Sequence, residues 1–317
     1  MKLLIFYLTD DRRHFTFPHF IKMLDKSKSK GLWKLITLTH SNDLDFYRNE
    51  VNKYDGINFD AVNVHYDDMN YLRKVNYAIN YAETNNFPYV MKCDNDIFMN
   101  AETLDYMIDN LHSLENSNHL TIGPVLTSGI PSVEYFKEQF LDNDAQRHLE
   151  GLFLKTTFQD NYCCGNYAYL NKHTTQSTEW KKEEFFENVR SMNHHYKGIH
   201  PIRVNEESLQ FLNNYIIKNK TRLLENNNSK LEIIYNNNSP YLCNSVFCIK
   251  TDTYKKVVTS DDLYVDQFEE VPLNKYCWNN KMNHLFIKNG FAIHMYYNWK
   301  ANHMEHERQF CNEFFER

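Results

Sequence analysis

Hydrophobic and polar positions alternate between strand-like runs and helix-like stripes along the first 125 residues. Leu3 to Leu8 is a continuous apolar run, typical of a strand buried on both faces, and apolar residues from Phe17 to Leu24 then recur at helical spacing. The same pattern predicts strands at 33–38, 60–64, 89–93 and 119–123 and helices around 72–82 and 104–111. This alternation predicts an α/β fold with a mostly parallel, Rossmann-like sheet and helices on both faces.

The pattern changes between residues 126 and 239, which are polar, aromatic and biased towards helix. Candidate helices cover 132–141, 179–192 and 206–225, and a short strand is expected at 231–235. From residue 240 the alternation returns, with a strand at 243–250, a helix from about Glu269 and a strand at 291–296. We therefore predict one α/β domain in which residues 126–239 are a helical insertion between 1–125 and 240–317, with a helix at the C-terminal end.

Composition and charge narrow the classes of function. The 317 residues carry a formal net charge of −6, which disfavours nucleic-acid binding over a broad surface. No run of about 18 apolar residues predicts a membrane span, and the apolar start leads straight into charged residues rather than a signal-peptide cleavage site. The seven cysteines lack CxxC spacing. They predict reduced, buried thiols and a cytoplasmic protein.

The sharpest chemical signal follows the predicted strand at 89–93, which ends directly in Asp94-Asn95-Asp96. The carboxyl ends of strands are where open α/β sheets bind ligands. Two carboxylates one residue apart can both reach a divalent cation, and such oxygen ligands suit Mg²⁺ or Mn²⁺. A bound cation can bridge a diphosphate and neutralise the charge on a departing nucleotide. The alternative is a solvated acidic turn, because Asp and Asn are common turn residues.

With this motif in this place, the sequence resembles nucleotide-sugar-dependent glycosyltransferases with the A-type fold, whose metal-binding DxD follows a strand of a Rossmann-like half. The resemblance covers most of 1–125 and 240–300. It implies that 1–125 bind the nucleotide sugar, that 240–317 form the acceptor and catalytic half, and that the whole is one catalytic domain. It also implies Mn²⁺ or Mg²⁺ as cofactor, a nucleoside diphosphate sugar as donor, with a UDP-sugar favoured, and a hydroxyl acceptor.

A second segment carries the resemblance to inverting members of this class. The apolar strand ending in Lys250 is followed by an acidic stretch that contains Asp266 and Glu269-Glu270. In similar enzymes the last acidic residue of an x-Glu-Asp helix start is the catalytic base, so Glu270 is the first candidate, followed by Glu269 and Asp266. Glu replaces the usual Asp, which leaves the choice among the three open. A carboxylate within about 3 Å of the acceptor hydroxyl can take its proton. The alternative is that these residues only favour a helix N-terminus electrostatically.

A histidine leaves the last predicted strand at position 294. It resembles the third metal ligand of many such enzymes, and imidazole suits Mn²⁺ better than Mg²⁺. The alternative is a core histidine hydrogen-bonded to a backbone carbonyl.

The resemblance also implies donor-binding positions after the first strand, at the start of the helix before the DxD, and within the motif itself. These positions are Thr9, Asp10, Asp11, Arg73, Asn76 and Asn95. The acidic residues can accept hydrogen bonds from ribose or base, and the arginine can pair with phosphate. Turn capping and ordinary surface exposure are the alternatives.

Two rival functions remain. A nucleotidyltransferase would share the sheet and the metal-diphosphate chemistry, but the loop after the first strand lacks the glycines expected of it. A carbohydrate-binding module would use the many aromatic side chains without catalysis. The sequence also lacks P-loop, dinucleotide, esterase and zincin motifs.

Overall fold

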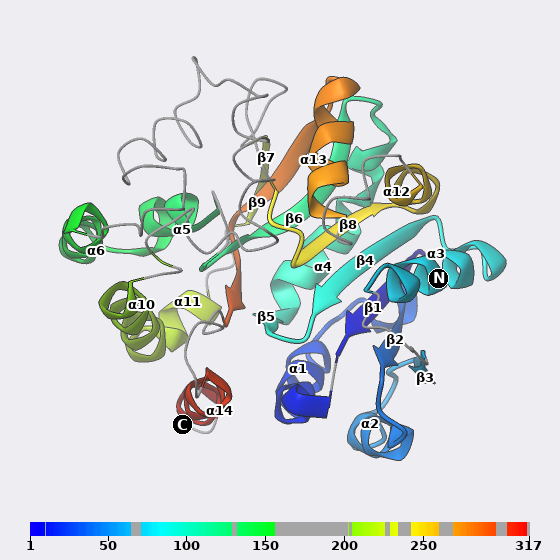
Figure 1. Cartoon of the computed structure of the whole chain (residues 1–317), viewed down its shortest axis with the longest axis horizontal. Coiled ribbons are helices and arrows are strands. Elements are labelled where there is room, and N and C mark those ends of the chain that lie inside the picture. Colours follow the sequence, from blue (N-terminus) through cyan, green and yellow to red (C-terminus); the bar gives the residue numbers. More distant parts are fainter. Residues whose placement is uncertain are drawn as a thin grey trace.

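The structure is a computed structural model, and it describes residues 1–9, 11–64, 71–128, 132–155, 202, 205–225, 229–233, 242–259, 269–295 and 303–315. These residues form a single β-sheet with helices packed around it (Figure 1). The predicted α/β class is therefore correct. The predicted helix at 179–192 lies outside the described residues.

The described strands make one nine-stranded sheet. Their order is β3-β2-β1-β4-β8-β6-β9-β5, and β7 pairs with β9 off this path. The strands are β1 (Leu3–Leu8), β2 (Trp33–Thr39), β3 (Phe59–Asn63), β4 (Tyr89–Asp94), β5 (Ile97–Met99), β6 (His119–Leu126), β7 (Lys230–Ile233), β8 (Val246–Lys250) and β9 (Asn283–His294).

The sheet is parallel on one side and mixed on the other. Strands β3, β2, β1 and β4 are parallel neighbours, whereas β8 runs antiparallel to both β4 and β6. Strand β9 is parallel to β6 and antiparallel to β5 and β7. The parallel half is the one that the alternating pattern predicts. Side-chain pattern does not encode strand direction, and the sequence analysis left the orientation of the strand at 243–250 open.

The register between β1 and β4 brings two strand ends together. Leu3 pairs with Tyr89 and Leu8 with Asp94, so both strands end at the same level. Every β1 side chain is buried, which explains its uninterrupted apolar sequence. Residues that follow β1 and β4 therefore share one edge of the sheet.

The described helices fall into two groups, and three short 3₁₀ turns accompany them. Helices flanking the sheet are α1 (Phe17–Leu24), α2 (Leu44–Val51), α3 (Tyr71–Thr84), α4 (Ala101–Asp109), α12 (Thr251–Val258) and α13 (Glu270–Asn279). A second group at one end comprises α5 (Ser132–Phe140), α6 (Asn143–Lys155), α10 (Glu206–Lys218), α11 (Lys220–Leu224) and α14 (His303–Phe315). The turns are η1 (Asp11–Thr16), η2 (Lys30–Leu32) and η3 (Leu111–Glu115).

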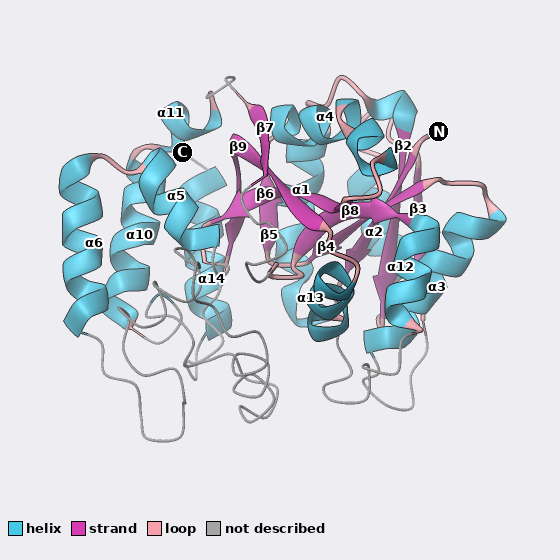
Figure 2. Ribbon diagram, turned by 90° about the horizontal axis from the view of Figure 1, so that it is seen from above, coloured by secondary structure: helices cyan, strands magenta, loops and turns pink. Residues whose placement is uncertain are grey.

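Helices cover both faces of the sheet, as the sequence predicts. Figure 2 shows α3, α12 and α13 on one side and α4 on the other. Local chemistry sets where two helices begin: the Asn100 side chain accepts a hydrogen bond from the backbone N–H of Thr103 at the start of α4, and the Asn205 side chain accepts one at the start of α10.

None of the described helices is long and apolar enough to cross a membrane. The five described cysteines are buried, as predicted.

An irregularity interrupts the pairing of β9 with β6. Its pairing with β6 jumps from Pro124–Ile287 to Val125–Phe291, so residues 288–290 form a bulge. Asn289 within it has a positive φ of 62°. A Cβ on Gly290 would lie 2.6 Å from Ile287 Cγ2, so only glycine fits this bend. The sequence analysis found only the last part of this strand, because the bulge interrupts its apolar pattern.

A buried histidine joins β6 to β9. The His284 side chain is 1% exposed, and its Nδ1 lies 2.8 Å from the Thr121 hydroxyl oxygen. Its Nε2 has no hydrogen-bond partner within the described part of the chain. Burial lowers the pKa of His284 to about 3, so the folded protein keeps the ring neutral.

We expect His284 to make folding sensitive to mild acid. Its pKa is about 6.5 when unfolded and about 3 when folded, so its contribution is complete above pH 6.5 and is lost as the pH falls below that value. The loss between pH 6.5 and pH 5 is about 2 kcal/mol of unfolding free energy. Urea unfolding measures the decrease in unfolding free energy between pH 7 and pH 5, and this decrease should be smaller by about 2 kcal/mol in His284→Gln than in the wild-type protein. Equal decreases in both proteins would contradict this prediction.

Candidate active site

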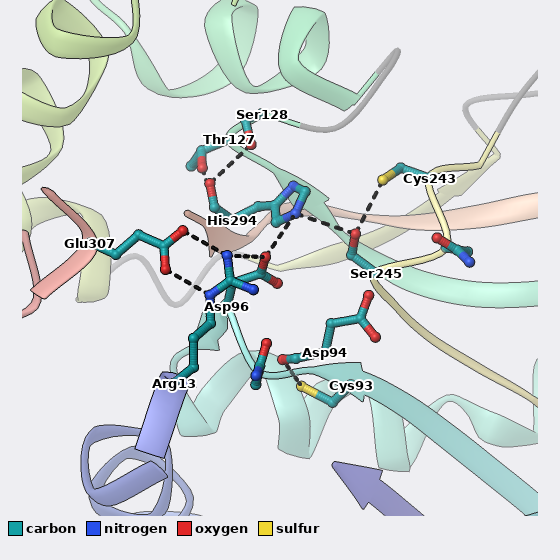
Figure 3. Close-up of polar contacts among 12 residues, drawn as sticks. Arg13, Cys93, Asp94, Asp96, Thr127, Ser128, Cys243, Ser245, His294 and Glu307 are labelled. Carbon is teal, nitrogen blue, oxygen red and sulfur yellow. Dashed lines mark hydrogen bonds and ion pairs between the residues drawn. The ribbon is translucent and has the colours of Figure 1, made fainter. Parts of the chain in front are cut away.

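The sheet edge where β1 and β4 end carries the Asp94-Asn95-Asp96 motif. Asp94 is the last residue of β4, and its backbone N–H donates to the Ser245 carbonyl 2.9 Å away, just before β8. Asn95 and Asp96 form the turn into β5. The motif is therefore fixed by strands on both sides, and its two carboxylates have different neighbours (Figure 3).

Asp94 is paired with a lysine from its own strand. Lys92 is fully buried, and its Nζ lies 3.0 Å from each oxygen of the Asp94 carboxylate. The Lys92 ammonium also donates to the Asn244 carbonyl. The pKa of Asp94 is raised to about 7, and burial is the largest cause. The positive charge of Lys92 opposes this rise, and the negative charges of Asp96 and Glu269 add to it. An additional cation beside Asp94 would favour its ionised form.

The same lysine reaches a second buried carboxylate. Glu269, directly before α13, is fully buried; its Oε1 lies 3.7 Å from Lys92 Nζ and accepts from the Tyr254 hydroxyl at 2.9 Å. Burial alone would lower the pKa of Lys92, but the charges of Asp94 and Glu269 outweigh it and raise that pKa. Lys92 is thus a permanently charged centre beneath the motif.

Asp96 faces the other way, towards β9 and η1. Its side chain is nine-tenths buried, with Oδ2 3.7 Å from His294 Nε2 and 4.0 Å from Arg13 Nη2. Its other oxygen, Oδ1, is buried and has no hydrogen-bond partner among the residues that the structure describes. An unpaired buried carboxylate oxygen is costly unless a further group binds it.

Backbone pairing places His294 beside Asp96. In the β5–β9 ladder His294 is opposite Ile97, the residue that follows Asp96. The His294 N–H donates to Thr127 Oγ1 at 3.0 Å, and its carbonyl accepts from Ser128 at 2.9 Å. Its Nε2 also lies 3.5 Å from Ser245 Oγ (Figure 3). The structure thus brings together the DxD and the histidine that the sequence analysis singled out.

A network around Tyr7 and a buried lysine fixes the end of β1. The Tyr7 hydroxyl is 3.2 Å from the Asn95 carbonyl, and the Asn95 amide is 3.5 Å from Thr9 Oγ1. Lys74 of α3 is buried and donates to the Thr9 carbonyl at 2.9 Å. Thr9 and Asn95, two predicted donor-binding residues, are therefore neighbours.

The other predicted site residues are less central. Glu270 is buried at the first position of α13, and its carbonyl accepts from Asn274 at 2.7 Å. Arg73 and Asn76 are exposed on α3, and the basic side chain that reaches the strand end is their neighbour Lys74. Asp10 and Asp266 lie outside the described residues. Asp11 begins η1, and its side chain is not described.

The sequence analysis missed three charged residues of this site. Lys92 carried a signal, because a lysine inside an otherwise apolar strand needs a buried partner. Arg13 and Glu307 form a buried ion pair beside Asp96, with Arg13 Nε 2.7 Å from Glu307 Oε2. They are 294 residues apart, and no local pattern connects them.

Within the described ranges, no group of three or more His, Cys, Asp or Glu side chains is arranged to hold a metal ion. Asp96 nevertheless has the character expected of a ligand, since a buried carboxylate oxygen lacks a partner. The aspartate and histidine pair is also chemically suited to Mn²⁺.

Comparison with known protein families finds no match, and neither does comparison with curated protein sequences. Among solved structures, the chain is similar to the 1–349 segment of S. aureus TarS in complex with UDP-GlcNAc, at 12% identity and a TM-score of 0.44, over 96% of this chain and 61% of that one. It is similar to the mannosyltransferase PcManGT from Pyrobaculum calidifontis in complex with GDP-Man and Mn²⁺, at 12% identity and a TM-score of 0.33, over 39% of this chain and 35% of that one.

A third similar structure is a cytidylyltransferase from Leptospira borgpetersenii, at 14% identity and a TM-score of 0.29, over 39% of this chain and 54% of that one. The chain thus spans less than two thirds of each of these three structures. The fold is defined by the strand order and register described above.

We expect Lys92→Met to destabilise the protein by about 3–5 kcal/mol, because Glu269 would stay buried without its cation. The double variant Lys92→Met/Glu269→Gln should recover part of this loss, since it removes the buried Glu269 charge together with Lys92 and leaves only the partly exposed Asp94 without its cation. Urea unfolding measures both values. Lys255→Met, which breaks the exposed pair with Glu83, is the matched control and should cost less than about 1 kcal/mol. A double variant no more stable than Lys92→Met would contradict the charge explanation.

Proposed function

We propose that this chain is a glycosyltransferase that moves a sugar from a nucleoside diphosphate sugar to a hydroxyl acceptor. The observation that carries the proposal is Asp96: a buried carboxylate at the carboxyl end of the parallel strands, with one oxygen that no described residue bonds and His294 beside the other. This is the edge at which α/β sheets bind nucleotides and phosphates.

Asp94, Asp96 and His294 are the residues that would hold a divalent cation. Carboxylate oxygens suit both Mg²⁺ and Mn²⁺, and the imidazole favours Mn²⁺. When bound, such a cation neutralises the charge that develops on the departing diphosphate. The Asp96 oxygen Oδ1 supports this role, because it has no hydrogen-bond partner among the described residues and a cation would supply one.

The donor nucleoside would lie next to the end of β1. Thr9 and Asn95 are neighbours there. The side-chain oxygens of both residues can accept hydrogen bonds from the hydroxyl groups of a ribose or the N–H groups of a base. Asp10, Asp11, Arg73 and Asn76 stay predictions as donor contacts, and a UDP-sugar stays the favoured donor. Residues 1–125 would then form the donor half and 240–317 the acceptor half, with 126–239 inserted between them in one catalytic domain.

Glu270 is the proposed base for the acceptor hydroxyl. Glu269 is fully buried and bonded to Tyr254 beside Lys92, so it is better suited to hold Lys92 than to meet a substrate. Asp266 stays a second candidate. A single carboxylate base acting on the face opposite the leaving diphosphate implies inversion at the anomeric carbon.

A screen of nucleotide sugars with Mn²⁺ tests the reaction class. We expect slow hydrolysis of one donor to a free sugar and a nucleoside diphosphate, and no turnover after chelation with EDTA. Release of pyrophosphate from a nucleoside triphosphate and a sugar phosphate would instead indicate a nucleotidyltransferase. Sugar binding without nucleoside diphosphate binding would indicate a carbohydrate-binding module.

Asp96→Ala should abolish turnover while changing the melting temperature by only a few degrees, because the lost carboxylate makes no close hydrogen bond in the described structure. Activity and thermal unfolding are measured on the same preparation. Asp105→Ala is a contrasting control: this carboxylate accepts hydrogen bonds from Ser27, Lys28 and Ser29, so its loss should lower stability more than turnover. An active Asp96→Ala protein would remove the proposed role of Asp96.

Glu270→Gln should lower kcat by about 10²–10⁴ with little change in donor KM, because a general base acts on the acceptor in the transition state. Glu305→Gln is the matched control, since Glu305 also occupies the first turn of a helix. Equal small effects in the two variants would indicate only a helix N-terminal preference. Product NMR should show inversion, and retention would contradict the assignment of Glu270.

A further inference from the structure

A buried ion pair joins the two ends of the described chain beside the motif. Arg13 Nε lies 2.7 Å from Glu307 Oε2, and Arg13 Nη2 lies 2.8 Å from Glu307 Oε1 (Figure 3). The Glu307 carboxylate therefore binds one edge of the guanidinium through both of its oxygens. Arg13 is 8% exposed and Glu307 is fully buried. Bidentate pairs of this kind are the strongest and most precisely oriented of ion pairs.

The same guanidinium lies near Asp96 but makes no hydrogen bond with it. Arg13 Nη2 lies 4.0 Å from Asp96 Oδ2, which is beyond hydrogen-bond distance. An arginine beside an aspartate ordinarily closes to about 2.8 Å. Here the bidentate contact with Glu307 fixes the orientation of the guanidinium, and Asp96 keeps its oxygen Oδ1 without a partner among the described residues.

A second connection fixes the backbone of Arg13 relative to the motif. Arg13 interrupts η1 with non-helical angles, φ −110° and ψ 26°, and its carbonyl accepts from Thr16 Oγ1 at 2.7 Å. The Tyr7 hydroxyl is 2.9 Å from Thr16 Oγ1 and 3.2 Å from the Asn95 carbonyl. The backbone of Arg13 is thus tied to the motif, while Glu307 sets where its guanidinium points.

We propose that Glu307 is a positioning residue: it holds the Arg13 guanidinium back from Asp96 and so keeps the Asp96 carboxylate available to a divalent cation. This inference rests on the proposed function, because it assigns Asp96 as a metal ligand. Without the Glu307 charge, the nearest carboxylate to Arg13 among the described residues is Asp96, 4.0 Å away, and we expect the two to approach each other. The cation would then have to displace an arginine.

Helix α14 has other contacts that hold it in place. Arg308 Cζ lies 4.5 Å from the centre of the Phe15 ring, and the Phe315 ring stacks on His19 at 4.6 Å and contacts Phe98 at 4.9 Å. Loss of the Glu307 charge therefore need not undock the helix. Arg308→Gln weakens the docking of the same helix without touching Arg13, which makes it the matched control.

The experiment compares the wild-type protein with Glu307→Gln, Arg13→Gln/Glu307→Gln and Arg308→Gln. Mn²⁺ affinity is measured from the EPR signal of free Mn²⁺, and crystal structures give the separation of Arg13 Nη2 and Asp96 Oδ2. We expect Glu307→Gln to weaken Mn²⁺ binding about tenfold and to bring this separation below about 3.2 Å. The double variant should bind Mn²⁺ within about threefold of wild type, because it has no arginine to compete. Arg308→Gln should bind like wild type.

Two results would overturn the inference. One is a Glu307→Gln structure in which Arg13 stays away from Asp96, and the other is a double variant that binds Mn²⁺ as weakly as Glu307→Gln. If Glu307 positions Arg13, adding Arg13→Gln to Glu307→Gln should restore Mn²⁺ binding. If Glu307 only supports the fold, the second substitution should weaken Mn²⁺ binding further. If wild-type protein binds no Mn²⁺, the metal part of the proposed function fails, and the separation in the Glu307→Gln crystal alone decides whether Glu307 restrains Arg13.

Discussion

Compensation of buried negative charge is the constraint that organises this protein. Asp96, Glu269 and Glu307 are buried at or near one edge of the sheet, where an isolated carboxylate is strongly disfavoured, and the partly exposed Asp94 lies beside them. Within the described residues, two cations meet them: Lys92 serves Asp94 and Glu269, and Arg13 serves Glu307 and faces Asp96. Lys92 comes from a strand of the sheet and Arg13 from the turn that follows β1.

This arrangement gives the two aspartates of the motif different characters. Asp94 is in direct contact with Lys92, whereas Asp96 has His294 and Arg13 at 3.7 and 4.0 Å and one oxygen that no described residue meets. Under the proposed function, Asp96 could bind the metal ion without giving up a hydrogen bond. Asp94 would have to give up part of its contact with Lys92 to bind the same ion.

Much of the framework follows from the sequence, because periodicity reports burial. The run from Leu3 to Leu8 predicts a buried strand, and the DxD is expected directly after a further strand of the parallel half; both strands are confirmed. Strand β5 has only three residues and escapes detection by pattern, although it places His294 beside Asp96. The Arg13–Glu307 pair escapes for another reason: ion pairing across 294 residues leaves no periodic trace.

The distance along the chain between Arg13 and Glu307 has a consequence for biosynthesis. A ribosome delivers the motif and the turn η1 long before it delivers α14, so the nascent chain holds Arg13 and Asp96 without the carboxylate that separates them in the finished fold. During that interval the nearest carboxylate to Arg13 among the described residues is Asp96. Late docking of α14 would then exchange one partner for another, so the edge of the sheet matures only when translation has passed residue 307.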